Sequence, residues 1–309
     1  MKKILIIKLG ALGDFMIAIG FMRTIQEKHP DAEFTLMTGK AFVSIAKQMN
    51  MFSHYIIDNR QSWLNIPYLA RLIKETSAGD FDCVYDIQAV NRTEKKYFAA
   101  MRFIARKSFV WYNVYRMTEW HVEKNGRFGM GKVTEKPGVS YRQLTDLSFL
   151  HGPNKHFDIL PERYVLLIPG CSAKNAHKRW PVASYNEIVK RLGERGIRSV
   201  VIGTNAEAAE INAICESSEY AINMLNKTAL LDVPDLARRA YVVMGNDTGP
   251  THMASFSGVP TIGVYWSKVR FGHLKGPRST SIVSPGSIDE ISVDEVWSHM
   301  LPFLEEAGV

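Results

Sequence analysis

The chain has 309 residues, of which 46% are hydrophobic and 22% charged, a composition typical of a soluble globular protein. The length suits two domains of about 150 residues each. No apolar run reaches the ~20 residues that a membrane-spanning helix needs. Lys8 interrupts the first apolar run and no cleavage site follows, so we expect no signal peptide. The three cysteines are widely spaced, which excludes a disulfide framework or zinc cluster and fits a reducing cytoplasm.

The charge is unevenly divided along the chain. Residues 1–155 carry a net charge of +9, and residues 156–309 carry −2. A basic first half suits an anionic partner such as a phosphorylated substrate or a lipid head group, although it can also serve only solubility.

The first half alternates apolar strands with helical segments. Strands are expected at 3–9, 34–38, 55–58, 83–87 and 109–112, and helices at 15–28, 41–49 and 63–76. This alternation predicts a parallel sheet that is covered by helices on both faces. In such sheets, ligands bind at the carboxyl ends of the strands.

The opening stretch, MKKILIIKLGALGD, places polar groups at such a strand end. Gly10 and Gly13 form a predicted turn after the strand, and Asp14 leads into the helix. Asp14 can serve as a helix cap, because Asp is favoured there, or as a catalytic carboxylate at the mouth of a site.

Residues 91–106 form a predicted basic amphipathic helix that includes Lys95, Lys96 and Arg102. Its basic face can be merely solvated, or it can contact an anionic membrane or a phosphorylated acceptor. Residues 113–143 show no regular pattern, and 151–162 reads as a linker between domains.

A second alternation follows the linker. Strands are expected at 164–168, 199–203, 221–224, 241–244, 261–265 and 281–283, and helices at 181–194, 206–216, 233–239, 251–257 and 293–306. The sequence therefore predicts two doubly wound α/β domains, at residues 1–155 and 156–309.

Chemistry concentrates at the strand ends of the second domain. The turn GNDTGP holds Asp247, Thr248 and Gly249 before a helix, where free amides favour an anion such as a diphosphate. Asp247 can accept hydrogen bonds from sugar hydroxyls or serve only as a turn residue.

Two further loops lie at the same predicted edge. The segment PGCSAKNAHKRWP brings together Ser172, Lys174 and Lys178, which suit a phosphate. Glu207 follows the next strand, where it can bind a ribose or simply begin a helix.

These motifs together resemble glycosyltransferase family 9, the heptosyltransferases of lipopolysaccharide core assembly. The matching stretches are KLGALGD, FDCVYDIQ, KRWP and GNDTGPTHMA, in the family's order over nearly the whole chain. The resemblance implies the GT-B architecture, with two Rossmann-like domains facing across a cleft and the helix at 293–306 packing back on the first domain.

The resemblance also implies roles for single residues. Asp14 matches the general base, with Gly10 and Gly13 as further candidates beside it. The implied donor-binding residues are Lys178, Glu207, Asp247, Thr248 and Gly249, and His252 is a further candidate within the last motif. The basic loop adds Ser172 as a donor-binding residue and Lys174 as a further candidate. Lys95, Lys96 and Arg102 would lie on the acceptor side. His252 can equally have a packing role.

The implied reaction is inverting transfer of a heptose from ADP-heptose to a phosphorylated, lipid-linked lipopolysaccharide core acceptor, without cofactor or metal. Asp80-Phe81-Asp82 looks like a metal-binding pair, but it precedes a strand. The enzyme would be cytoplasmic and peripheral to the inner membrane. The alternatives are a transferase or epimerase that uses a UDP- or GDP-hexose, and a nucleotide-binding module without catalysis. A dehydrogenase is disfavoured because Lys8–Asp14 lacks G-x-G-x-x-G.

Overall fold

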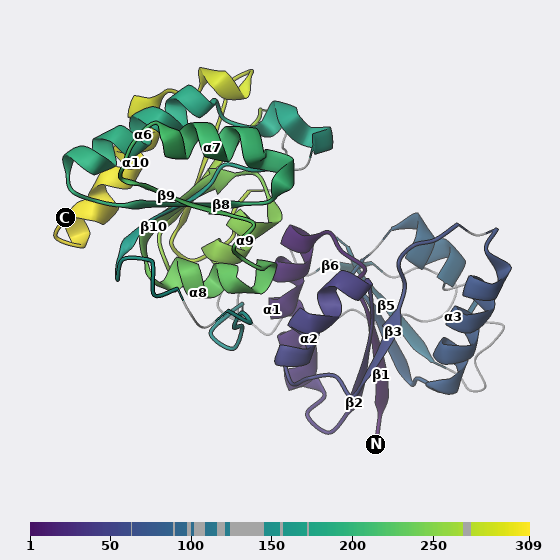
Figure 1. Cartoon of the computed structure of the whole chain (residues 1–309). Coiled ribbons are helices and arrows are strands. Elements are labelled where there is room, and N and C mark those ends of the chain that lie inside the picture. Colours follow the sequence, from purple (N-terminus) through teal and green to yellow (C-terminus); the bar gives the residue numbers. More distant parts are fainter. Residues whose placement is uncertain are drawn as a thin grey trace. The chain divides into compact units, whose positions relative to one another are not determined.

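The computed structural model describes residues 1–62, 64–88, 90–97, 100–101, 109–115, 121–123, 145–154, 157–171, 173–267 and 273–309. For residues 94–95, 112–115, 121–123 and 173–174 it describes only the backbone. The chain divides into two compact units, Met1–Thr145 and Asp146–Val309, each built around its own sheet (Figure 1). This division falls ten residues before the boundary that the sequence suggests. Among the helices of the described residues, none is both long and apolar enough to cross a bilayer.

The first unit contains a six-stranded sheet in the order β3-β2-β1-β4-β5-β6. Its strands are β1 (Lys3–Ile7), β2 (Glu33–Thr38), β3 (His54–Ile57), β4 (Cys83–Asp86), β5 (Val110–Tyr115) and β6 (His121–Glu123). Its α-helices are α1 (Leu12–Lys28), α2 (Val43–Gln48) and α3 (Ile66–Ala78). The predicted parallel sheet is confirmed for β1 to β5, and β6 pairs with β5 in the antiparallel sense.

Helices cover both faces of this sheet. In Figure 1, α1 and α2 lie on one side of the strands and α3 on the other. Right-handed crossovers require this arrangement, because the chain moves outward from β1 to β3 and then returns to the other side of β1 at β4. Leu72 of α3 packs in a core cluster with Leu5, Val84 and Trp111.

Three local features differ from the sequence prediction. Helix α1 begins at Leu12, so Gly13 and Asp14 lie in its first turn rather than before it. Residues Arg92–Tyr97 form a π-helical segment rather than part of a regular α-helix. Strand β6 lies in the region 113–143, where no element is predicted, because three residues are too few to show a periodic pattern.

The second unit contains a fully parallel sheet in the order β12-β11-β10-β7-β8-β9. Its strands are β7 (Tyr164–Ile168), β8 (Ser199–Gly203), β9 (Ala221–Leu225), β10 (Ala240–Asn246), β11 (Thr261–Tyr265) and β12 (Ser279–Val283). Its α-helices are α6 (Val182–Glu194), α7 (Ala208–Glu216), α8 (Val233–Arg238), α9 (Gly249–Ser255) and α10 (Val293–Glu306). The strand order reverses between β7 and β10, and such a switch point is where open α/β sheets bind ligands.

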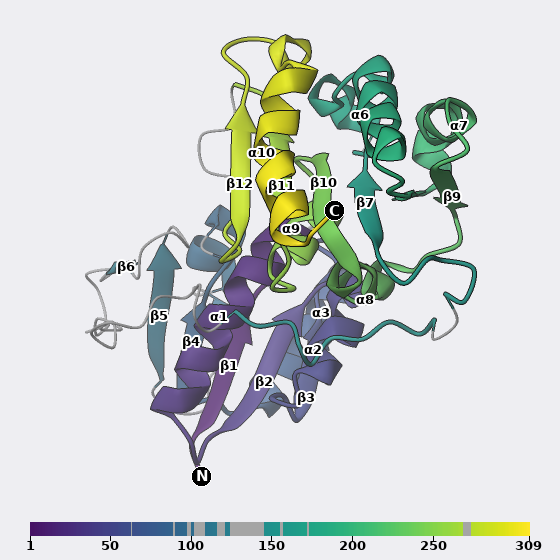
Figure 2. The same cartoon turned by 90° about the vertical axis from the view of Figure 1, so that its left-hand side faces the viewer.

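The helices of the second unit also form two layers. Figure 1 shows α6 and α7 on one face of the sheet and α8 and α9 on the other. Helix α10 packs against α6 and over β10 and β11 (Figure 2). Its buried residues Val296, Met300 and Leu304 join a core cluster that includes Trp180 and Tyr185. The predicted contact of this helix with the first domain stays a prediction.

Candidate active site

A buried asparagine joins the two strand ends at the switch point. Asn246, the last residue of β10, is fully buried. Its side-chain amide donates to the carbonyl of Pro169, and its Oδ1 accepts from the backbone N–H of Trp180 at 3.1 Å and from the Tyr185 hydroxyl at 3.2 Å. Asn246 therefore ties both ends of the loop after β7 to β10. No role for it is predicted from the sequence, although it stands inside the GNDTGP turn.

The next residue, Asp247, contacts two basic side chains. Its Oδ2 lies 2.6 Å from Lys178 Nζ, and its Oδ1 lies 3.4 Å from His252 Nε2. Burial acts to raise the pKa of Asp247, but the hydrogen bonds and positive charge of its two neighbours outweigh burial and lower the pKa. Asp247 is therefore an ionised carboxylate held between two donors.

The turn continues directly into α9. Thr248 is the N-cap residue in extended conformation, and its side chain makes no capping hydrogen bond. Gly249 is the first residue of the helix. Gly245, just upstream, has no room for a side chain, because a Cβ would lie 2.5 Å from Thr251 Oγ1 and 2.9 Å from the carbonyl oxygen of Ile168. The two glycines thus serve close packing and the helix start.

A hollow opens beside this turn at the carboxyl ends of β7 and β8. Residues from four loops line it, among them Gly170, Thr204, Glu207, Thr228 and Thr248. Glu207 is 8% exposed, and its Oε2 accepts from both the backbone N–H and the hydroxyl of Thr204, at 3.0 and 2.7 Å. It thus begins a helical turn, as one of its two sequence interpretations expects, while it also lines the hollow.

The loop after β7 is held by residues that do not face Asp247. Arg179 pairs with Glu210 of α7 and donates to the carbonyl of Cys171 at 2.7 Å. The Cys171 thiol contacts the carbonyl of Asn175 at 2.9 Å, and burial raises its pKa, which disfavours a reactive thiolate. Among the described side chains of this loop, that of Lys178 contacts Asp247. Ser172 lies outside the described residues, and of Lys174 only the backbone is described.

The turn after β1 is fixed by the motif that ends β4. The Gln88 side-chain oxygen accepts from the backbone N–H of Leu9 at 2.9 Å, and the backbone N–H of Gln88 donates to the carbonyl of Ile7 at 3.1 Å. Gly10 has a φ of +126°, and a Cβ there would lie 2.8 Å from the ring of Phe42, so this position requires glycine.

Asp14 is exposed in the first turn of α1. The N-cap of this helix is Ala11, which makes no side-chain capping bond, and the structure gives Asp14 no hydrogen bond to the helix amides among the described residues. The capping interpretation of Asp14 is therefore not what the structure shows. Its carboxylate is accessible at the carboxyl edge of the first sheet.

Among the described residues of the first unit, the charged side chains of Lys8, Asp58 and Asp86 are buried near this edge. Lys8 is only 1% exposed, and burial lowers its pKa to about 8, although the carboxylates of Asp14 and Asp86 act to raise it. Asp58 is fully buried. It accepts from the hydroxyls of Tyr68 and Tyr97, from Arg92 at 3.3 Å and from the backbone of Arg60 at 2.7 Å. None of the three is assigned a site role from the sequence.

The predicted acceptor-side residues are only partly described. Arg102 lies outside the described residues, only the backbone of Lys95 is described, and Lys96 is exposed. Asp80 and Asp82 precede β4 at the amino edge of the sheet, and Asp82 accepts from the backbone N–H of Lys3 at 2.8 Å. In the described part of the chain, no group of three or more metal-ligating side chains occurs.

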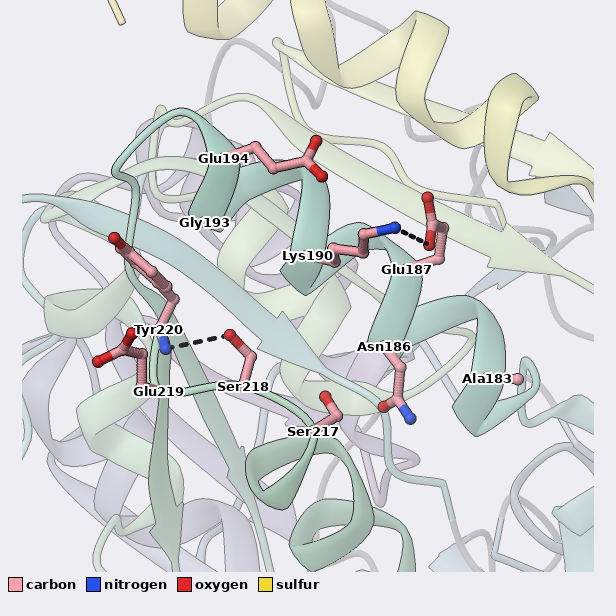
Figure 3. Close-up of a pocket in the computed structure, with 10 residues that line it drawn as sticks. All are labelled: Ala183, Asn186, Glu187, Lys190, Gly193, Glu194, Ser217, Ser218, Glu219 and Tyr220. Atoms are coloured by element: carbon pink, nitrogen blue, oxygen red, sulfur yellow. Dashed lines mark hydrogen bonds and ion pairs between the residues drawn. The ribbon is translucent and has the colours of Figure 1, made fainter.

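A larger hollow of the second unit lies away from the strand ends that carry this chemistry. It has a volume of about 660 Å³ and is lined by one side of α6 and by residues 217–220 (Figure 3). Glu194 and Tyr220 come shortly before β8 and β9, so this hollow extends toward the amino edge of the sheet. Its charged residues include Lys190 and Glu187, which pair with each other at 3.9 Å.

Two Rossmann-like domains in one chain, each with a mainly parallel sheet, form the GT-B architecture, and solved heptosyltransferases share this fold. The family model of glycosyltransferase family 9 (heptosyltransferase) matches residues 123–278, and the chain belongs to this family.

Characterised relatives are similar to this chain in sequence, and solved structures are similar to it in fold. The chain is 24% identical to the lipopolysaccharide core heptosyltransferase OpsX of Haemophilus influenzae, over 85% of this chain and 79% of the relative. A family 9 glycosyltransferase of Veillonella parvula has a similar fold, with a TM-score of 0.74, 17% identity and coverage of 99% and 97% of the two chains. E. coli heptosyltransferase WaaC with ADP-2-deoxy-2-fluoro heptose gives a TM-score of 0.67, 19% identity and 99% coverage of both chains.

Proposed function

We propose that this glycosyltransferase moves a heptose from ADP-heptose to the core of a lipopolysaccharide precursor, with inversion and without a metal ion. One observation carries the proposal. Lys178 Nζ and Asp247 Oδ2 lie 2.6 Å apart at the switch point, so a cation for a phosphate stands beside an acceptor for sugar hydroxyls.

The neighbouring hollow supports a nucleotide donor. It is lined by Glu207 and Thr248, which offer an acid for ribose hydroxyls and a hydroxyl beside Asp247. A nucleoside in this hollow would place its diphosphate next to Lys178 and the start of α9. The choice of ADP-heptose is supported by the family and by the ADP-heptose analogue in the WaaC structure, which has a similar fold.

The reaction needs one base and a stabilised leaving group. We propose that the accessible carboxylate of Asp14 takes the proton from the acceptor hydroxyl as that oxygen attacks the anomeric carbon. The bond from this carbon to the diphosphate breaks in the same step, and negative charge grows on the leaving ADP. Lys178 would stabilise this charge, which is why an inverting single displacement can proceed without a metal.

Metal independence has a direct test. Transfer is expected to continue at the same rate in the presence of EDTA, because Lys178 supplies the positive charge beside the diphosphate. Loss of transfer in EDTA, with recovery on addition of Mg²⁺, would show that a cation is required and that this part of the proposal is wrong.

The acceptor is proposed from charge and from the relatives. Residues 1–155 carry a net charge of +9 and include Lys95, Lys96 and Arg102, which suits a phosphorylated lipid-linked acceptor. OpsX is named for the lipopolysaccharide core. Such an acceptor would place the protein at the cytoplasmic face of the inner membrane, bound peripherally.

Donor choice is tested by thermal unfolding of the full chain with ADP-heptose, UDP-hexoses and GDP-hexoses. ADP-heptose is expected to raise the melting temperature most, and Lys178→Ala is expected to abolish most of that rise. Lys190→Ala is the matched control, since Lys190 lies on α6 outside the proposed site. Stabilisation by the hexose nucleotides alone would overturn the ADP-heptose assignment and favour a different nucleotide-sugar.

A further inference from the structure

Asp247 uses its two oxygens for two different partners. Oδ2 contacts Lys178, which comes from the loop after β7, and Oδ1 faces His252, which lies in α9, the helix that follows Asp247. The side chains of Lys178, Asp247 and His252 are 22%, 12% and 8% exposed. The lysine is thus the most accessible member and the histidine the most buried.

The three residues differ in how firmly they are held. Asp247 follows the fully buried Asn246, whose amide is hydrogen-bonded at both ends, so the backbone at Asp247 is fixed. His252 lies in the packed second turn of α9. Lys178, by contrast, ends a 3₁₀ segment with a kink at Asn175, and its ammonium sits on a flexible four-carbon stem. Lys178 can therefore change partner without rearrangement of the sheet, whereas the backbone of Asp247 stays in place and its side chain depends on its remaining contact with His252.

The ion pair also has an electrostatic consequence. A carboxylate 2.6 Å from the ammonium neutralises much of the charge that an incoming phosphate would meet. A phosphate that binds Lys178 must therefore compete with Asp247 for it. When the lysine turns to the phosphate, Asp247 Oδ2 becomes free to accept a hydrogen bond from the sugar.

We infer that donor binding exchanges the partner of Lys178, from Asp247 to the diphosphate, and that His252 is a positioning residue that holds Asp247 in place during the exchange. The inference rests on the proposed function, because it takes a nucleoside diphosphate to be the donor's leaving group. It adds that the Lys178–Asp247 ion pair lowers the affinity for the nucleotide. It also adds that phosphate binding to Lys178 makes Asp247 Oδ2 available to a sugar hydroxyl.

The exchange is tested with ADP, which carries the diphosphate but no sugar, by calorimetric titration of the full chain. Asp247→Asn keeps the size of the side chain and removes its charge. This variant is expected to bind ADP roughly three- to ten-fold more tightly than the wild type, because Lys178 no longer has a charged competitor. Asp294→Asn is the matched control: it removes the same charge from an exposed acid on α10 and should leave ADP affinity unchanged.

The same substitution in the Lys178→Ala variant distinguishes the proposed partner exchange from simple repulsion between Asp247 and the phosphate. In Lys178→Ala, the exchange predicts that adding Asp247→Asn gives no further gain in ADP affinity. An equal gain in both backgrounds, or no gain in either, would overturn the inference. If ADP fails to bind the folded wild type at all, the nucleotide-donor proposal itself is wrong, so the two failures are distinguishable. Circular dichroism confirms that each variant is folded.

The role of His252 is tested by two substitutions. Gln can still donate a hydrogen bond to Asp247, and Leu cannot. His252→Leu is expected to keep the affinity for ADP but to lose most of the additional affinity for ADP-heptose, and His252→Gln is expected to restore it. An equal loss for both ligands in His252→Leu, without rescue by Gln, would show that His252 only packs the helix.

Discussion

Replacement of Lys8 by Met should stabilise the first unit, because a buried lysine carries an electrostatic cost that a methionine of similar size does not. Lys8 is 1% exposed, and burial lowers its pKa from 10.5 to about 8. At 1.36 kcal/mol per pKa unit, this interval corresponds to about 3 kcal/mol in favour of the uncharged form. Lys8→Met is therefore expected to raise the free energy of unfolding by up to about 3 kcal/mol at pH 7.

The gain should depend on pH in a defined direction. Below pH 8, Lys8 is charged in both states, and the full cost of burying the charge is present. Between pH 8 and 10.5 the folded protein loses this proton and the unfolded chain keeps it, so the unfolding free energy of the wild type rises relative to the variant. The advantage of Lys8→Met should therefore shrink across this interval.

Urea unfolding followed by circular dichroism at pH 7, 8 and 10 measures this dependence. Lys3→Met is the matched control, since Lys3 begins β1, the strand that Lys8 directly follows, but is exposed, and it should show neither the gain nor the pH dependence. A variant that is less stable than the wild type at pH 7, or a gain that is independent of pH, would refute the reasoning. A stabilised variant with slower transfer would indicate that the charge is retained for its effect on Asp14.

Three further substitutions test other parts of the structure. Asp14→Asn should lower turnover by about 10²- to 10⁴-fold while ADP affinity stays unchanged, as measured by transfer rate and titration; normal turnover would remove Asp14 as the base. Asn246→Leu should lower the free energy of unfolding by about 3 kcal/mol and weaken ADP binding, because the Trp180 amide and the Pro169 carbonyl lose their partner. Urea unfolding measures this loss, and an unchanged unfolding midpoint would argue against it. Asp58→Ala should destabilise the first unit by about 3 kcal/mol yet leave ADP affinity intact, and a loss of ADP binding by a folded variant would contradict this independence.

Much of the fold follows from the sequence because strands in a parallel sheet are continuous apolar runs. Three strands of the second unit, Tyr164–Ile168, Ser199–Gly203 and Thr261–Tyr265, begin and end where the sequence places them. Because the loops that hold Lys178 and Asp247 both follow parallel strands, the sequence also predicts that they lie at one edge of the sheet, and in the structure the two side chains form an ion pair. The start of α1 was harder to predict, because Gly13 disfavours a helix interior and suggests a turn, whereas burial of Phe15 and Met16 extends the helix across it.

The residues that the sequence left unassigned act through tertiary hydrogen bonds. Asn246 and Asp58 are polar residues at strand ends, a position that is usually a turn, and nothing local shows that each is fully buried with several partners from distant segments. Glu207 carried two interpretations, because a capping acid and a ribose-binding acid occupy the same helix start. The sequence gives His252 no single role, because its contact with Asp247 depends on how α9 is oriented relative to the end of β10.

The central claim is transfer of a heptose from ADP-heptose, and analysis of the reaction product by mass tests it most directly. The protein is incubated with a lipopolysaccharide-core acceptor and an equimolar mixture of ADP-heptose, UDP-hexose and GDP-hexose. We predict that the acceptor gains the mass of one heptose, that ADP is released in equal amount, and that Asp14→Asn forms no product in the same time. A product that gains a hexose with release of UDP or GDP would contradict the claim.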